Sequence, residues 1–209
     1  MNSSSSLERC CLITVGATVG FQSLIETALN PDFWRFLSAR GFTKLRIQCG
    51  PDAQWAEDML ATTKEKVPSG IEIKIFATRK NLMKEEMTLC KPVEGRRSQG
   101  LVISHAGTGT ILDAWKLGLP IVVVPNSSLL DDHQTEMARH LAKEGYATMS
   151  STDCKDLQEA IHKSELLADE NKFRWPTHSV QANSTAKTRL WEMAPVEIEK
   201  EQDTQMIFD

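Results

Sequence analysis

Short apolar stretches alternate with longer amphipathic segments along most of the chain. Several of the short stretches are apolar at consecutive positions, which is typical of parallel strands that helices cover on both faces. Strands are predicted at residues 10–15, 44–49, 71–76, 101–104 and 121–124. The spacing of apolar residues predicts helices at residues 22–29, 33–40, 53–66, 81–91, 110–117, 131–144 and 156–167. This order predicts an α/β fold, a Rossmann-like parallel sheet with helices on both faces.

The same pattern suggests where the domain ends. Residues 10–194 are expected to form one domain behind a flexible amino terminus, residues 1–9. Residues 184–193 could add a short helix around Leu190 and Trp191, which would pack either on a partner subunit or on its own domain. Residues 195–209 are acidic and contain few apolar residues, so we expect this tail to be disordered.

Composition and charge exclude several classes of protein. The chain has 209 residues, of which 41% are hydrophobic and 25% charged, as in ordinary globular domains. A formal net charge of -4 argues against a broad nucleic-acid surface. No apolar run is long enough to cross a bilayer, and the amino terminus lacks the basic and apolar parts of a secretory signal. We therefore expect a cytoplasmic protein.

The five cysteines show neither metal-ligand spacing nor an even count. Cys10, Cys11 and Cys49 fall in strand-like runs, where buried small apolar residues are expected rather than ligands or nucleophiles. We expect no metal and no cofactor.

A first glycine-containing motif, Gly16-Ala17-Thr18-Val19-Gly20-Phe21, follows the first strand. A strand, a glycine turn and a helix start are the opening of a mononucleotide-binding fold. Glycine lets the backbone approach a ligand, and amides at a helix start favour phosphate. A tight turn between a strand and a helix also favours glycine when no ligand binds there. Ligand binding and turn geometry therefore explain this motif equally well.

A second motif spans residues 101–120, LVISHAGTGTILDAWKLGLP. Gly107 and Gly109 remove side chains where a phosphate could meet helix-start amides, and Thr108 or Thr110 could cap the helix or donate to an oxygen. Asp113 lies about one turn into the helix, where it could hold a ribose diol. His105 ends the strand at the edge where open α/β sheets bind ligands. The alternatives are that His105 only contacts a backbone carbonyl and that Asp113 only offsets the helix dipole.

A third motif, residues 125–134, follows the next strand and leads to the same edge. The side chains that offer hydrogen bonds suited to sugar hydroxyls are those of Asn126, Asp132, His133 and Gln134. Capping of the following helix by Asp131 or Asp132 is an additional role of this segment. The polar residues 91–100 are expected to be a solvated loop, with phosphate binding by Gly95-Arg96-Arg97 as the less favoured alternative.

Other nucleotide-binding motifs are absent from the sequence. A P-loop requires Lys followed by Ser or Thr after its glycines, and no such motif occurs. The glycines at 16 and 20 and at 107 and 109 do not fit the dinucleotide spacing, and no acid stands at the end of the second strand. A nucleoside-diphosphate sugar remains compatible with this geometry.

Residues 101–134 closely resemble the cytosolic subunits of the eukaryotic UDP-N-acetylglucosamine transferase of the dolichol-linked oligosaccharide pathway. This family is similar to the carboxyl-terminal half of a GT-B glycosyltransferase. The resemblance implies that the loop after the first strand and the turn after the fourth face the UDP diphosphate. It implies that Asp113 takes the ribose hydroxyls. The donor-binding residues that it implies are Gly16, Ala17, Thr18, His105, Ala106, Gly107, Thr108, Gly109, Asp113, Asn126, His133 and Gln134. Residues 79–100 fit the family pattern poorly.

The resemblance also implies a function. The enzyme would transfer the second N-acetylglucosamine to GlcNAc-diphospho-dolichol with inversion, as one half of a heteromer. A membrane-anchored, acceptor-binding partner would recruit this chain to the cytosolic face of the endoplasmic reticulum. No catalytic base is assignable within the chain. Two alternatives are a non-catalytic nucleotide-sugar-binding module and a complete small Rossmann enzyme for another nucleotide.

Overall fold

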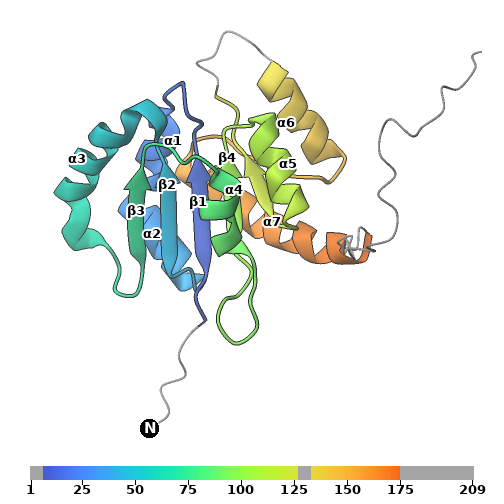
Figure 1. Cartoon of the computed structure of the whole chain (residues 1–209), viewed down its shortest axis with the longest axis horizontal. Coiled ribbons are helices and arrows are strands. Elements are labelled where there is room, and N and C mark those ends of the chain that lie inside the picture. The colour runs from blue at the N-terminus through green and yellow to red at the C-terminus, as the bar shows by residue number, and fades with distance from the viewer. Residues whose placement is uncertain (1–6, 127–132, 175–209) are drawn as a thin grey trace, which may run out of the picture. The chain divides into compact units, whose positions relative to one another are not determined.

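The computed structural model describes residues 7–126 and 133–174, which form a six-stranded parallel sheet flanked by helices (Figure 1). The strands are β1 (Cys10–Thr14), β2 (Lys44–Gln48), β3 (Glu72–Phe76), β4 (Leu101–Ser104), β5 (Ile121–Val123) and β6 (Thr148–Met149). The helices are α1 (Gln22–Ala28), α2 (Pro31–Ala39), α3 (Ala53–Thr63), α4 (Leu82–Glu85), α5 (Thr108–Lys116), α6 (His133–Lys143) and α7 (Cys154–Arg174). Short 3-10 turns are η1 (Gly50–Asp52), η2 (Lys64–Lys66) and η3 (Met87–Cys90).

The strand order is β3-β2-β1-β4-β5-β6, and all neighbours are parallel. β1 lies in the middle, with Cys11 opposite Leu45 of β2 on one side and Leu101 of β4 on the other. The chain runs outward from β1 through β2 to β3 and then returns to β4 on the other side. The carboxyl ends of β1 and β4 therefore mark the topological switch point, where open α/β sheets place their ligands.

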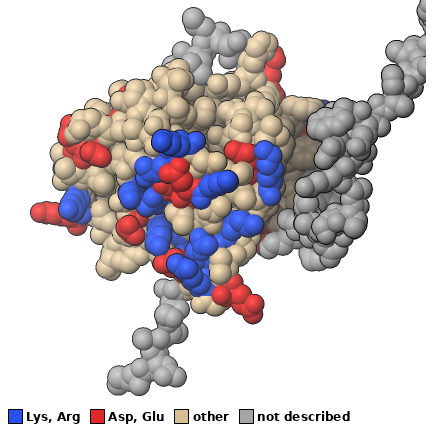
Figure 2. All heavy atoms as spheres, in the orientation of Figure 1, with Lys and Arg blue, Asp and Glu red and all other residues tan. Residues whose placement is uncertain are grey.

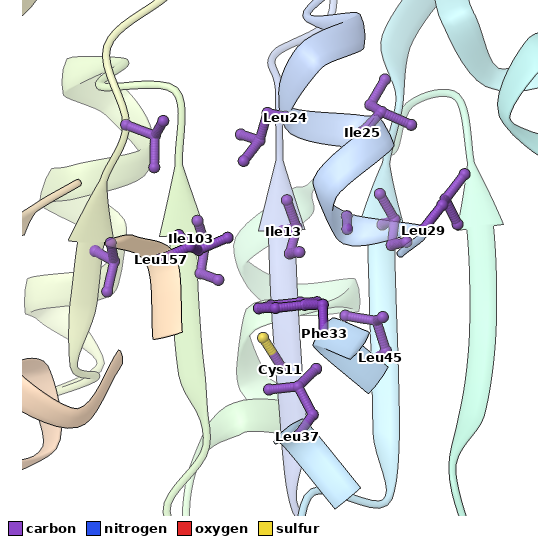
Figure 3. Packing of buried hydrophobic residues seen from close by; sticks show 14 of the residues in the cluster. Cys11, Ile13, Leu24, Ile25, Leu29, Phe33, Leu37, Leu45, Ile103 and Leu157 are labelled. Carbon is purple, nitrogen blue, oxygen red and sulfur yellow. The ribbon is translucent and has the colours of Figure 1, made fainter. Parts of the chain in front are cut away.

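One face of the sheet is covered by α1, α2, α3 and α7. Phe33 and Leu37 of α2 lie over β1 near Cys11, and Leu157 of α7 lies beside Ile103 of β4 (Figure 3). A buried tryptophan on α2, Trp34, donates its indole N–H to the carbonyl of Ala28 at 2.8 Å. This bond satisfies the only polar atom of that side chain, so α1 and α2 pack tightly at little polar cost.

The opposite face is covered by η3, α5 and α6, with α4 beside them. Cys10 and Leu12 of β1 point into this second cluster, whereas Cys11 and Ile13 point into the first. β1 is thus buried on both faces, as its unbroken apolar run predicts. Figure 2 shows that Lys and Arg side chains gather around a few acidic ones over β2, β3 and α4.

The predicted helix at residues 81–91 is wrong in one respect, because it is broken into α4 and η3. The break falls at Glu86, which is only 1% exposed. Its carboxylate accepts from the guanidinium of Arg46 on β2 at 2.9 Å and from Nε of Arg79 at 2.7 Å. Holding a buried carboxylate between two cations outweighs the local preference for a continuous helix.

Other boundaries shift by less. α3 ends at Thr63 and continues as η2, and α5 begins two residues before the predicted start. β6 was not predicted because it has only two residues. α7 runs to Arg174 rather than to residue 167. One contact beyond residue 167 is the side-chain amide of Asn171, which donates to the carbonyl of Gly145 at 2.9 Å.

The predicted burial of cysteines is confirmed. Cys10, Cys11, Cys49 and Cys90 are buried, and all five cysteines are free. Desolvation by burial is the largest cause that raises the pKa of the Cys49 thiol, to about 12. The Cys49 thiol is therefore an uncharged, apolar group in the core.

Residues 91–100 form a loop, as predicted. Val93 and Arg97 make an isolated antiparallel bridge, and Arg97 donates from Nη1 to the carbonyl of Thr88 at 3.1 Å. At the expected flexible amino terminus, the described residue Glu8 bridges to Arg97. The predicted helix around Leu190 and Trp191 and the acidic tail lie outside the described residues. Within residues 7–126 and 133–174, no helix combines the length and the apolar character that a membrane span requires.

Candidate functional site

The two glycine turns of the sequence meet at the switch point, on either side of one imidazole. His105 follows β4, and its amide donates to the carbonyl of Thr14 at the end of β1 at 3.1 Å. A Cβ on Gly16 would lie 3.1 Å from Nε2 of His105, and a Cβ on Gly107 would lie 2.6 Å from the same atom. The His105 ring therefore occupies the space that a side chain at either glycine would enter. The sequence analysis had explained these glycines by the approach of a ligand or by the turn itself, and did not predict a contact with His105.

The histidine itself is largely buried. Its Nδ1 lies 3.3 Å from the carbonyl of Thr14, which is the backbone contact that the sequence left as an alternative. Burial lowers the pKa of His105 from its ordinary value, only partly opposed by this contact. The ring is thus neutral at pH 7, and because a carbonyl accepts, the proton belongs on Nδ1.

The loop after β1 exposes its middle and fixes its ends. Ala17, Thr18 and Val19 are exposed, whereas Gly16 has a positive φ of 92° that favours glycine. The side-chain amide of Asn126, which follows β5, donates to the carbonyl of Gly20 at 3.3 Å. The predicted residue Asn126 is therefore buried in contact with the backbone of the loop that follows β1.

The turn after β4 passes directly into α5. Ala106 has a positive φ of 67°, and Gly107 is the N-cap residue in an extended conformation. No side chain caps this helix, so the prediction that Thr108 or Thr110 does so is wrong. The physical reason is that the helix begins at Thr108, which places both threonines inside the first turn. The hydroxyl of Thr108 lies 3.6 Å from Sδ of Met137 instead.

The start of α5 is open. Thr108 and Gly109 are exposed, and a Cβ on Gly109 would have no atom within 4 Å. The first amides of a helix have no partner within the helix, and they carry the positive end of its dipole. This end can therefore accept the oxygens of a phosphate.

Asp113 lies four residues after Gly109, hence on the same side of α5. Its carboxylate pairs with Lys116 at 3.1 Å and its side chain is one third exposed. A solvent-facing carboxylate with one flexible lysine partner remains available to hydroxyl donors.

His133 and Gln134 open α6. The His133 side chain is exposed, with Nδ1 3.9 Å from a carboxylate oxygen of Glu136. The side-chain oxygen of Gln134 is buried and accepts no hydrogen bond from the described part of the chain. Asp131 and Asp132, the predicted caps, lie outside the described residues.

Sequence reasoning missed the η1 turn that follows β2. Gly50 has a positive φ of 53°, and a Cβ there would lie 2.8 Å from the carbonyl oxygen of Gly16. The carboxylate of Asp52 lies against Gly20. An acid was expected only at the end of the second strand itself. The Gly-Pro-Asp sequence directly after that strand is typical of a turn and could have indicated this one.

Residues 10–189 match the glycosyltransferase family 28 C-terminal domain. The chain belongs to this family. The match confirms the predicted class of enzyme, a glycosyltransferase, and the resemblance from which that prediction came.

Curated relatives agree with this assignment. The chain is similar to the UDP-N-acetylglucosamine transferase subunit ALG13 of Cryptococcus neoformans, with 33% identity over 163 residues that cover 72% of this chain and 80% of the relative. The protein of the same name from Saccharomyces cerevisiae is 32% identical over 153 residues, which cover 66% of this chain and 76% of the relative.

Solved structures confirm the predicted fold class. An NMR solution structure of ALG13 superimposes with a TM-score of 0.57 at 26% identity, over 77% of this chain and 87% of that one. MurG of Acinetobacter baumannii gives a TM-score of 0.57 at 21% identity, over 85% of this chain and half of that one, and shows the fold alone. In the described ranges, no group of three or more His, Cys, Asp or Glu side chains could hold a metal ion.

Proposed function

We propose that this chain is the donor-binding half of a UDP-N-acetylglucosamine transferase. The observation that carries the proposal is the meeting of two glycine turns on His105 at the switch point, beside the open start of α5. Family membership and the names of the relatives supply the substrate class. The open start of α5 supports a diphosphate site at this edge of the sheet.

The start of α5 would receive the diphosphate. Backbone amides of Thr108, Gly109 and Thr110 point out of an exposed helix start, and their partial charges cost no reorganisation when the leaving UDP gains charge. Asp113, one turn further on the same side, would take the ribose hydroxyls. Gly16, Ala17, Thr18, Ala106 and Gly107 would form the walls around the donor, with Asn126, His133 and Gln134 on the side of α6.

The acceptor hydroxyl would attack the anomeric carbon of the sugar with inversion, as UDP leaves. We assign no base to this chain and no metal to the donor site. The acceptor would be GlcNAc-diphospho-dolichol, which a membrane-anchored partner subunit would present at the cytosolic face of the endoplasmic reticulum. The name "subunit" of the relatives supports a heteromer.

The test is copurification of the chain from membranes, followed by a transferase assay with radiolabelled UDP-N-acetylglucosamine. We expect labelled chitobiosyl lipid only when the copurified partner is present. Titration of the complex should show preference for uridine diphosphate compounds over adenine ones. Donor binding without any lipid-linked product would replace the transferase with a binding module, and equal binding of adenine compounds would reject the proposal.

A further inference from the structure

The η1 turn touches both ends of the loop that follows β1. Gly50 at its start lies so close to the carbonyl of Gly16 that any side chain would collide with it. Asp52 at its end lies against Gly20, where a Cβ would come within 2.8 Å of the Asp52 Cγ. Pro51 between them restricts the turn further. The exposed residues 17–19 are thus suspended between two fixed points.

Only one of the two oxygens of the Asp52 carboxylate accepts a hydrogen bond within the described residues. Nε2 of Gln22 donates to Oδ1 at 3.2 Å. Oδ2 is buried and accepts no hydrogen bond from any residue that the structure describes. A buried carboxylate oxygen without a donor costs stability, and such costs are found where the structure serves a binding site. An apolar side chain would fill this position without that cost.

We propose that Asp52 is a positioning residue that clasps Gly20 and so fixes the loop at residues 16–20 in the shape that receives the donor. This inference rests on the proposed function for its effect on the donor, but the clasp itself is a property of the free chain. Asp52 acts through the loop and touches no reacting atom.

A purely structural role is the alternative. α1 has no side-chain cap, and a carboxylate near its start could simply favour the helix dipole. The two roles differ in what they change. Loss of a dipole partner lowers the stability of the whole domain slightly, whereas loss of the clasp loosens residues 16–20 and weakens donor binding selectively.

Gly20 offers a direct test because its φ is not in the left-handed region, and the three atoms that a Cβ there would approach most closely all belong to the Asp52 carboxylate. Gly20→Ala should displace the loop. In Gly20→Ala/Asp52→Ala the colliding carboxylate is gone, so the double variant should behave like Asp52→Ala alone. Such non-additivity is the signature of two groups in direct contact.

The experiment has two readouts. Backbone NMR order parameters of the full chain report the loop without any donor, and the KM for UDP-N-acetylglucosamine of the complex reports donor binding. Asp52→Ala should lower the order parameters of residues 17–19 from about 0.85 to below about 0.6. It should raise KM about fivefold, with kcat within about twofold. Asp52→Asn keeps the shape and should restore both values. Asp58→Ala is the matched control, an exposed acid on α3 that accepts from Gln54 at 3.2 Å.

Failure of the clasp and failure of the proposed function are distinguishable. If residues 17–19 have the same order parameters in Asp52→Ala as in Asp58→Ala, or if the effects of Gly20→Ala and Asp52→Ala add, the clasp is refuted whatever the complex does. If the order parameters fall as expected but the wild-type complex transfers no sugar, the clasp is supported and the proposed function is rejected.

Discussion

The two glycine turns at the switch point look alike in sequence but differ in structure. The turn after β4 passes at once into α5, and its exposed start has free space around Gly109. The loop after β1 is longer, and η1 and Asn126 hold both its ends before α1 begins. An open helix start can bind a diphosphate, whereas a loop that is held at both ends can form a rigid wall of a binding site.

His105 joins the two turns and makes them depend on each other. Its ring occupies the space that glycine leaves at Gly16 and at Gly107. A change at either glycine therefore moves the same ring, while a change at Gly109 moves nothing.

The open turn should tolerate a large side chain structurally but not functionally. A tryptophan at Gly109 would meet no atom within 4 Å of its Cβ among the residues that the structure describes, and it would cover the start of α5. We expect the transferase activity of the complex to fall at least about 100-fold, because diphosphate can no longer reach the amides. The melting temperature of the free chain should stay unchanged. Full activity of this variant would separate the start of α5 from the donor site.

In contrast to the turn after β4, a substitution at a residue that holds the loop after β1 should lower the stability of the free chain. Gly50→Ala forces a positive φ on alanine and a collision with the carbonyl of Gly16, which together cost about 2–3 kcal/mol. Urea denaturation of the free chain measures this cost. Gly41→Ala is the control, because it has a positive φ of 79° but no atom within 4 Å of its Cβ. An equal loss in both variants would mean that the contact with Gly16 contributes nothing.

Asp113→Ala tests the proposed ribose contact. We expect the affinity of the complex for UDP to fall about tenfold, the worth of one charge-assisted hydrogen-bond pair, with the unfolding free energy unchanged. Lys116→Ala is the matched control, because it breaks the same ion pair and leaves the carboxylate in place. If both variants lose the same affinity, the pair and not Asp113 is what matters.

The smallest effect concerns the pH dependence of stability. The pKa of His105 is lowered in the folded chain from its ordinary value of 6.5. When the pH falls below about 6.5, His105 therefore binds a proton more readily in the unfolded chain than in the folded one. This group makes the free energy of unfolding rise with pH up to about 6.5, and the contribution is lost as the pH falls below that value. Urea unfolding between pH 5 and 8 should show this slope, and His105→Gln should flatten it. An unchanged slope in the variant would assign the proton to another group.

Local pattern was enough to predict most elements but not their interruptions. Each of the five predicted strands matches an observed strand to within one residue. The runs of β1, β4 and β5 are easiest to recognise because these strands are buried along their whole length. The break between α4 and η3 was not predictable locally, because its cause is the pairing of Glu86 with Arg46, a residue 40 positions away on β2.

For the candidate site, the sequence by itself determined the glycines, His105 and the small-residue start of α5. These features are local, because a turn between a strand and a helix requires particular residues at particular positions. Only the tertiary structure decided that Gly16 and Gly107 face one imidazole, that Asp52 meets Gly20 and that Asn126 binds the same loop. These contacts join the ends of β1, β2, β4 and β5. Strand order sets them, and strand order is a property of the whole sheet rather than of any stretch of sequence.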